Sequence, residues 1–306
     1  MLGNKVFRSW GRILSGKSPV LSIEITNKCP LSCPGCYAFH PEHVSGRSLD
    51  SIPDFTGDEL VQRVLALVRK KRPVGLFLVG GEPLVRLREL RRLVPELSGM
   101  GVTTEVVTSG VIPIPIEWKD LPGVSVVVSV DGLQPDHDRR RKPATYQKIL
   151  ENIKGREVII HCTVTSQMAL KADSLREFAG YWAGVDEVSS IRFSLYTPQV
   201  GETSEEILSP DLRKRVVEEL RDLQKVEPKL RLNSPMLDAY LSPPRNPRKC
   251  IFASITECLS SDLETEVTPC QLGGNPDCSR CGCIAAVGCQ AIGDYRIPDR
   301  KSTRLN

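Results

Sequence analysis

Six short apolar runs alternate with longer segments that carry apolar residues at helical spacing, from residue 20 onward. This alternation is typical of repeated strand–helix units, which build a parallel sheet. The predicted strands cover residues 20–25, 75–79, 104–107, 124–130, 158–164 and 191–196. The pattern therefore predicts an α/β fold built on a partial (β/α)6 barrel of parallel strands.

Helices are expected between these strands and after the last one. They cover residues 57–71, 86–100, 144–154, 174–182 and 209–226. The last helix begins with a capping residue, Ser209, before a proline at the first helical position. In such barrels the functional loops gather at the C-terminal ends of the strands, so the residues that follow each strand are the candidates for the functional site.

A proline-rich break at residues 242–247 precedes a change in composition toward cysteine and glycine. We predict an N-terminal extension (1–19), the barrel (20–241) and a small cysteine-rich C-terminal domain (248–298). So small a segment can hardly build its own apolar core, so we expect metal to organise it.

The last eight residues, 299–306, can be encoded by GATCGGAAGAGCACACGTCTGAAC, which matches a common sequencing adapter read in frame. We treat them as an artefact and expect the native protein to continue differently after Pro298. They carry three basic residues and one acidic residue, so removing them takes the formal charge from +4 to +2. That small charge predicts no nucleic-acid partner.

No apolar run approaches the roughly 20 residues of a membrane span, and the start of the chain lacks the apolar stretch of a secretory signal. We therefore expect a cytoplasmic protein with no membrane span. The chain has eleven cysteines, three of them between residues 29 and 36 and seven between 250 and 289. Tight groups of cysteine in a cytosolic protein favour metal binding over disulfides.

The first group, Cys29, Cys33 and Cys36, lies on one short loop directly after the first predicted strand. A cubane iron–sulfur cluster usually takes four cysteines, so a loop that supplies three leaves one iron without a protein ligand. An open position on a metal is where a cofactor or substrate binds. The alternative is a structural zinc site, for which His40 and His43 are nearby candidates for a fourth ligand.

The spacing Cys-x3-Cys-x2-Cys after a first strand closely resembles the radical S-adenosylmethionine (SAM) superfamily. The resemblance implies that Cys29, Cys33 and Cys36 hold a [4Fe-4S] cluster whose open iron chelates the amino and carboxylate groups of SAM. In this family an electron from the cluster cleaves SAM to a 5′-deoxyadenosyl radical. Many members carry an aromatic residue before the third cysteine to pack on adenine; this chain has Gly35 there, and Tyr37 is the expected substitute.

Residues after the next strands extend the resemblance. Gly80, Gly81, Glu82 and Pro83 are similar to the family's Gly-Gly-Glu-Pro motif, which implies that backbone carbonyls and the Glu82 carboxylate receive the SAM ammonium. After the fourth strand, Ser129 and Asp131 have the groups to hydrogen-bond the SAM carboxylate or ribose. The alternative for this pair is a turn with its own local hydrogen bonds.

The C-terminal cysteines loosely resemble the SPASM and twitch domains that hold auxiliary clusters beside the substrate in many radical SAM enzymes. A hairpin within residues 259–269 would bring two of the thiols together. One auxiliary [4Fe-4S] cluster is the better count and two is the alternative. The expected ligands are Cys258, Cys270, Cys278 and Cys281, with Cys283 as a close substitute, while Cys250 and Cys289 are spare or ligate a second cluster. A zinc ion held by four thiolates competes with this interpretation, because sulfur ligands alone do not distinguish the two metals.

His161 and Cys162 are neighbours in the fifth predicted strand, so one should point into the barrel, and we expect both to serve packing. Another expectation concerns eight basic residues that we interpret as solvated surface: Arg86, Arg88, Arg91, Arg92, Arg139, Arg140, Arg141 and Lys142.

The resemblance implies an enzyme, an oxidoreductase in the broad sense, that abstracts hydrogen from a peptide, protein or small-molecule substrate. It would receive electrons from a donor such as flavodoxin or ferredoxin. The rival hypothesis is a noncatalytic electron carrier or metal-binding scaffold with a structural zinc domain.

Overall fold

A computed structural model describes residues 2–143 and 145–293. Its sheet has seven parallel strands in the order β6-β5-β4-β3-β2-β1-β7. The strands are β1 (Val20–Glu24), β2 (Gly75–Val79), β3 (Thr103–Thr108), β4 (Val124–Ser129), β5 (Val158–Val164), β6 (Val188–Leu195) and β7 (Thr256–Leu259). The parallel α/β fold is as predicted, and each of the six expected strands is present.

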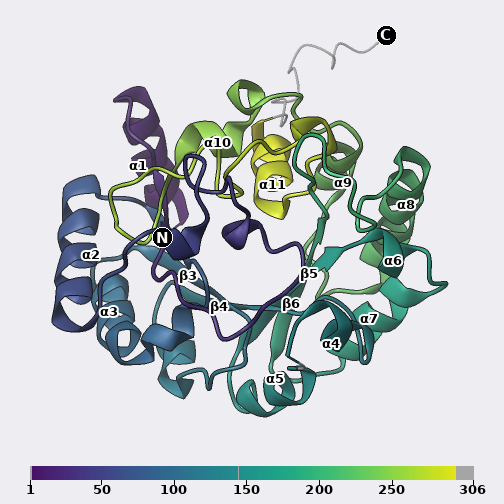
Figure 1. Cartoon of the computed structure of the whole chain (residues 1–306), viewed down its shortest axis with the longest axis horizontal. Helices are drawn as coiled ribbons and strands as arrows, with labels where there is room; N and C mark the ends of the chain where they lie inside the picture. The colour runs from purple at the N-terminus through teal and green to yellow at the C-terminus, as the bar shows by residue number, and fades with distance from the viewer. Residues whose placement is uncertain (1, 144, 294–306) are drawn as a thin grey trace, which may run out of the picture.

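Helices follow the convex side of the curved sheet, from α2 and α3 at one edge to α7 and α8 at the other (Figure 1). The later helices α9, α10 and α11 lie across its open side (Figure 1). The helices are α1 (Leu2–Leu14), α2 (Gly57–Lys71), α3 (Leu87–Gly99), α4 (Asp136–Arg140), α5 (Tyr146–Asn152), α6 (Ser166–Ala169), α7 (Ser174–Ala183), α8 (Pro210–Val226), α9 (Ser234–Leu241), α10 (Ile251–Ile255) and α11 (Ile284–Gly293). The predicted cap of α8 is present, since the Ser209 hydroxyl accepts a hydrogen bond from the Leu212 amide at 3.2 Å.

The seventh strand comes from the cysteine-rich segment, which the sequence did not predict. It pairs with β1 in parallel, with Ser22 opposite Cys258. After β7 the chain turns back, and the Val267 amide donates to the Cys258 carbonyl at 2.9 Å. The expected hairpin is therefore present, and its first strand belongs to the same sheet as the barrel.

The apolar core lies between the convex face of the sheet and the helices. Alternate residues of each strand point there, such as Ile23 of β1, Leu78 of β2 and Cys162 of β5, and all three are fully buried. The opposite face carries polar side chains, among them Glu105 of β3 and Arg192 of β6. These two form an ion pair at 2.8 Å although β3 and β6 are not neighbours in the sheet. The concave face is therefore a polar lumen spanned by side chains.

Replacing Ile23 by alanine should remove buried methyl groups from the centre of the core. We expect urea unfolding to show a loss of about 2–5 kcal/mol in the free energy of unfolding. Val226, at the end of α8, is 69% exposed. Val226→Ala is the matched control and should change stability by less than about 0.5 kcal/mol. Equal effects of the two substitutions would contradict this description of the core.

Candidate functional site

The three clustered cysteines lie on the loop that leaves the C-terminal end of β1. Cys29, Cys33 and Cys36 are all free and partly exposed. Burial raises the pKa of Cys29 to about 11, and repulsion from Glu82, Cys36 and Cys33 adds to the rise. The thiols therefore lie within electrostatic range of one another and of the Gly-Gly-Glu-Pro turn, at the end of the barrel where functional loops gather.

Tyr37, the residue after Cys36, opens a short 3-10 turn (Tyr37–Phe39). Its ring packs edge-on against His43, with the ring centroids 5.6 Å apart. Burial of its hydroxyl raises the pKa of Tyr37, and the charges of Glu24, Cys36, Cys283 and Cys258 raise it further. Tyr37 thus reaches from the cluster loop toward the C-terminal cysteines.

Two buried arginines stand next to the cluster loop, which corrects the expectation of a solvated basic run. Arg140 and Arg141 both pair with Asp131, and their side chains are only 19% and 20% exposed. Burial raises the pKa of Cys36, whereas the Arg141 guanidinium and two backbone amides oppose that rise. Arg141 therefore supplies positive charge where anionic thiolates would gather. The segment is also tied to the loop directly, since the Ser32 amide donates to the Lys142 carbonyl at 2.7 Å.

Arg86 was also expected on the solvated surface, and its side chain is instead largely covered. It donates to Asp54 at 2.6 Å, with its side chain 16% exposed. Asp54 also accepts from the Thr26 hydroxyl at 2.6 Å, directly after β1. Sequence reasoning missed Arg86, Arg140 and Arg141 because their acidic partners are distant in sequence or lie on another turn. The one available signal was Asp131, an acidic residue just after β4 that precedes Arg140 by nine positions.

The Gly-Gly-Glu-Pro turn runs directly alongside the start of the cluster loop. The Gly81 amide donates to the Thr26 carbonyl at 3.0 Å, and the Glu82 amide donates to the Lys28 carbonyl at 2.8 Å. A Cβ on Gly81 would lie 2.2 Å from the Lys28 carbonyl oxygen, so no larger residue fits without moving the backbone. The glycine therefore sets the distance between the two motifs.

The Glu82 carboxylate is buried and fully hydrogen-bonded. One oxygen accepts from the Leu84 amide at 2.9 Å and the Thr108 hydroxyl at 2.6 Å, and the other from the Ser109 amide at 2.7 Å and hydroxyl at 2.5 Å. A carboxylate has about four acceptor positions. Glu82 thus binds the end of β3 to its own turn, and all four positions are in use.

Asp131 accepts three hydrogen bonds from protein groups, shared between its two oxygens. Its oxygens accept from Arg140, from Arg141 at 2.8 Å and from the Thr163 amide at 3.0 Å. Burial disfavours the Asp131 carboxylate, but the two arginines outweigh that cost and hold its pKa well below the usual range. Ser129 ends β4, with the backbone of His161 beside it in the neighbouring strand. The structure thus brings Ser129 and Asp131 together but commits Asp131 to protein partners.

His161 points into the lumen and Cys162 into the core, as the strand alternation required. Cys162 is fully buried, whereas the His161 ring nitrogen Nε2 lies 2.8 Å from the Ser194 hydroxyl. Burial lowers the pKa of His161 to about 4, so the imidazole is neutral at pH 7. Together with Arg192 and Glu105, it gives the lumen wall both donors and acceptors.

The C-terminal segment reaches the lumen through close backbone contacts with β6. The Leu195 amide donates to the Gly282 carbonyl at 2.9 Å, and a Cβ on Gly282 would lie 2.1 Å from the Leu195 carbonyl oxygen. The Ile284 amide donates to the Ser194 hydroxyl at 3.1 Å. Cys281 and Cys283, on either side of Gly282, are thereby held against the end of the barrel.

Five thiols line one small cavity in this segment. They are Cys250, Cys270, Cys278, Cys281 and Cys283. Cys258 lies on β7 among Val44, Ile52 and Val267, and burial raises its pKa to about 12, with Glu24 and Cys283 adding to the rise. Cys289 lines a different pocket. The structure thus brings together four of the five expected ligands, adds Cys250, and leaves Cys258 at the margin.

The thiols are the donor set that a cubane cluster uses. In the described ranges 2–143 and 145–293, no three His, Cys, Asp or Glu side chains are arranged around one ion position. A cubane binds each thiolate through a different iron, so its ligands need not converge on one point. Three neighbouring thiols beside a buried guanidinium fit such a cluster.

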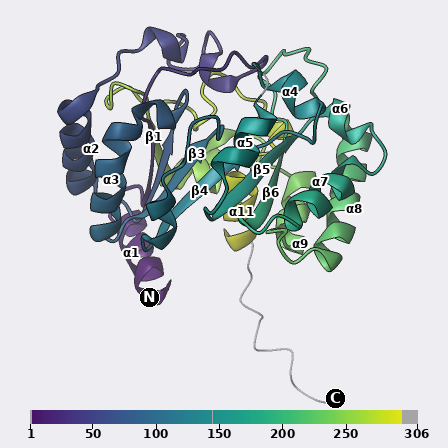
Figure 2. The same cartoon turned by 90° about the horizontal axis from the view of Figure 1, so that it is seen from below.

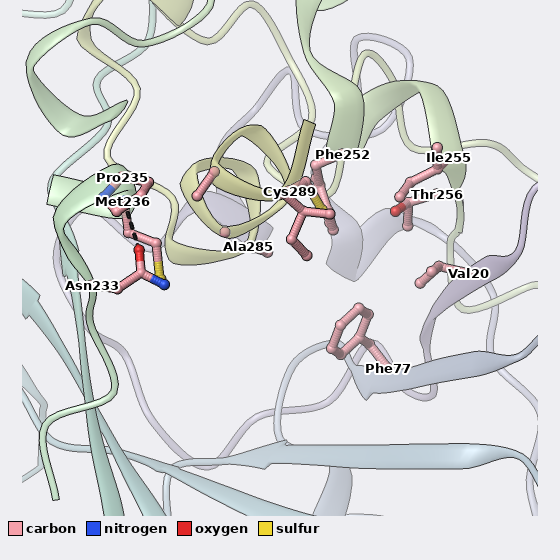
Figure 3. Close-up of a pocket in the computed structure, with 13 residues that line it drawn as sticks. Val20, Phe77, Asn233, Pro235, Met236, Phe252, Ile255, Thr256, Ala285 and Cys289 are labelled. Carbon is pink, nitrogen blue, oxygen red and sulfur yellow. Dashed lines mark hydrogen bonds between the residues drawn. The ribbon is translucent and has the colours of Figure 1, made fainter. Parts of the chain in front are cut away.

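The largest cavity that we describe lies away from these loops (Figure 3). It has a volume of about 450 Å³, and apolar residues of α9, α10 and α11 make most of its wall (Figure 3). Val20 and Thr256, the first residues of β1 and β7, also line it. It therefore opens at the N-terminal ends of the strands, opposite the cluster loop.

Gly81→Ala should test the contact between the two motifs. The added methyl group would collide with the Lys28 carbonyl, so we expect a loss of about 1–3 kcal/mol in unfolding free energy and at least tenfold weaker SAM binding. Gly180→Ala is the control, because no atom lies within 4 Å of a Cβ at Gly180 in α7. SAM titration of both reconstituted variants would check the prediction, and unchanged affinity in Gly81→Ala would refute it.

Comparison with solved structures shows where this fold recurs. The structure "Native anSMEcpe with bound AdoMet" is similar with a TM-score of 0.60 and 19% identity, covering 79% of this chain and 72% of that one. Streptococcus suis SuiB bound to precursor peptide SuiA is similar with a TM-score of 0.62 and 13% identity, covering 88% of this chain. The match spans only 63% of the SuiB chain, less than two thirds of its length. At these identities the similarity concerns the fold alone.

The family comparison concerns the part of the chain that carries both motifs. The model of the radical SAM superfamily matches residues 23–179, just over half of the sequence. That span begins within β1 and includes the cluster loop, the Gly-Gly-Glu-Pro turn and the ends of β3 and β4. The chain therefore belongs to the radical SAM superfamily of enzymes, whose cofactors are a [4Fe-4S] cluster and S-adenosylmethionine.

Proposed function

We propose that this enzyme holds its SAM-binding [4Fe-4S] cluster on Cys29, Cys33 and Cys36 and abstracts hydrogen from a peptide substrate. The observation that carries the proposal is the hydrogen-bonded contact between the cluster loop and the Gly-Gly-Glu-Pro turn, with three free thiols on one side. When bound, the cluster supplies the electron that cleaves SAM. The chain's own task is to bind and orient SAM and to keep the radical away from water.

The residues at the strand ends have different roles in binding SAM. Glu82 accepts four protein hydrogen bonds, so its role is to hold the Gly-Gly-Glu-Pro turn against the end of β3. Backbone carbonyls of Gly80 and Gly81 then receive the SAM ammonium. Ser129 hydrogen-bonds the SAM carboxylate or ribose, and Asp131 supports it by ordering Arg140 and Arg141. The role of Tyr37 against adenine stays a prediction.

A peptide is the favoured substrate for two reasons. The lumen wall carries a neutral imidazole and the Arg192–Glu105 ion pair, which suit backbone amides and carbonyls. SuiB, which shares the fold, has been solved with a precursor peptide. A protein segment or a small molecule remains the alternative. The electron donor would be a flavodoxin or ferredoxin, and a cytoplasmic location would keep the thiols reduced.

An auxiliary [4Fe-4S] cluster would lie in the C-terminal segment, next to the lumen. Support comes from the shared cavity of Cys250, Cys270, Cys278, Cys281 and Cys283 and from the contact of Gly282 with β6. Cys250 joins the predicted ligands on this evidence. Cys258 remains a candidate because it lies within electrostatic range of Cys270 and Cys283. A structural zinc ion is the competing occupant.

The triple variant with Cys29, Cys33 and Cys36 replaced by alanine should lose about half of the iron from a total of about eight per chain. Anaerobically reconstituted wild-type protein should yield 5′-deoxyadenosine from SAM after dithionite reduction, and the triple variant should yield none. Cys162→Ala is the control, because Cys162 lies in the core away from both groups. Full iron content in the triple variant would refute the ligand assignment.

The double variant Cys278→Ala with Cys281→Ala tests the auxiliary site. We expect about half of the iron to disappear while uncoupled SAM cleavage persists, because the first cluster keeps its ligands. A structural zinc ion would contribute its binding energy to folding, so its loss should instead give aggregated protein. Metal analysis and Mössbauer spectra of the full chain decide between these results. Zinc together with iron for a single cluster would overturn the auxiliary cluster.

A further inference from the structure

Helix α1 presents an apolar face whose side chains are exposed to solvent in the described residues 2–143 and 145–293. Phe7 and Leu14 are each 83% exposed, and Trp10 and Ile13 are 60% and 40% exposed. At 100° per residue these four side chains share one side of the helix. A helix of this length is marginal in water without packing. We therefore expect another molecule to cover the apolar side of α1.

The other side of the helix is basic. Arg8 and Arg12 lie opposite the apolar stripe, Lys17 follows the helix, and no acidic residue occurs before Glu24. The end of α2 adds exposed Arg69, Lys70 and Arg72 directly before β2. Glu257 of β7 is already paired with Lys71, the last residue of α2, at 2.5 Å. This end of the molecule thus carries unneutralised positive charge.

The helix is fixed to the barrel at its C-terminal end. Arg12 donates two hydrogen bonds to the Ser18 carbonyl, at 3.0 and 2.8 Å, which closes the end of the helix. The next residue, Pro19, accepts from the Val74 amide at 2.7 Å, just before β2. Figure 2 shows α1 extending from one edge of the molecule, with the end of α11 at the same edge.

We propose that α1 anchors the enzyme to the surface of an anionic phospholipid bilayer, with its apolar face in the interface and its basic face toward the headgroups. Exposed aromatic and aliphatic side chains opposite lysine and arginine are the features of helices that lie in a membrane surface. The apolar pocket of Figure 3 and exposed Ile292 lie at the same end of the barrel. The cluster loop lies at the opposite end and stays free for SAM and substrate.

A second copy of the chain fits this surface less well. Two copies facing each other at this end would also bring Lys17 and the basic end of α2 toward the same groups of the other copy. Like charges opposed across an interface disfavour association. No helix of the described residues is long and apolar enough to cross a bilayer, and surface binding does not require one.

The fluorescence emission of Trp10 can report binding of α1 to vesicles. The chain has three tryptophans, and Trp118 and Trp182 are at most 1% exposed, so a change in emission on vesicle binding reports Trp10. Reconstituted full-length protein should sediment with vesicles of phosphatidylcholine mixed with phosphatidylglycerol, and its emission should shift to the blue. Binding to pure phosphatidylcholine should be at least tenfold weaker, and salt should weaken binding to the anionic vesicles.

Two pairs of variants separate the charge from the apolar face. Arg8→Glu with Lys17→Glu should weaken binding at least tenfold, while Lys148→Glu with Lys214→Glu, exposed lysines of α5 and α8, should leave it unchanged. Phe7→Ser with Leu14→Ser should abolish the blue shift, and Leu170→Ser with Val226→Ser, which are similarly exposed, should not. Far-UV circular dichroism verifies that all four variants are folded.

Three results would overturn the proposal. The first is no sedimentation with anionic vesicles, and the second is equal binding by the α1 variants and their controls. The third is a lipid-independent dimer in sedimentation velocity that Phe7→Ser with Leu14→Ser dissolves, since the apolar face would then serve self-association. Each result is independent of the cluster assignment, because none is read from SAM chemistry.

Discussion

The pairing of β1 with a strand on each side is the interaction on which the whole site depends. On one side β2 delivers the Gly-Gly-Glu-Pro turn to the cluster loop, and on the other β7 delivers the cysteine-rich segment. Both neighbours are parallel to β1, so the loops that follow them leave at the same end. A single strand therefore aligns the three parts of the chain that carry the chemistry.

Buried carboxylates stabilise this alignment. Glu82 joins the ends of β2 and β3, and Asp131 orders the two arginines beside the cluster loop. Glu24, at the end of β1, accepts from the Ser260 hydroxyl at 2.9 Å and lies 2.5 Å from Nε2 of His43. Nδ1 of His43 donates to the Leu272 carbonyl at 3.0 Å, because a carbonyl can only accept. Both ring nitrogens of His43 are therefore engaged by protein groups, so His43 ties the cluster loop to the C-terminal segment rather than ligating zinc.

These networks also explain how far prediction from sequence could go. Some features depend only on residues that are close together in the sequence, and these were predictable. They are the six barrel strands, the Ser209 cap and the two motifs at the ends of β1 and β2, which follow from apolar periodicity, capping chemistry and loop spacing. Arg140 and Arg141 were misread, because a basic run is solvated unless a distant acid neutralises it. The apolar side of α1 was missed for a related reason: amphipathic spacing is visible in sequence, but whether the apolar side chains are buried or exposed is not.

The sequence by itself determined the family, the parallel α/β architecture and the position of the first thiol group, because these follow from residue spacing along one stretch of chain. Only the tertiary structure decided that the cysteine-rich segment supplies a seventh strand and that Cys250 shares a cavity with Cys270, Cys278, Cys281 and Cys283. It also decided that Glu82 has no acceptor position to spare and that Asp131 is held by two arginines. These features depend on contacts between residues that are distant in the sequence. Buried polar groups form hydrogen bonds with one another, and a group that is already bonded in this way is not available to a ligand.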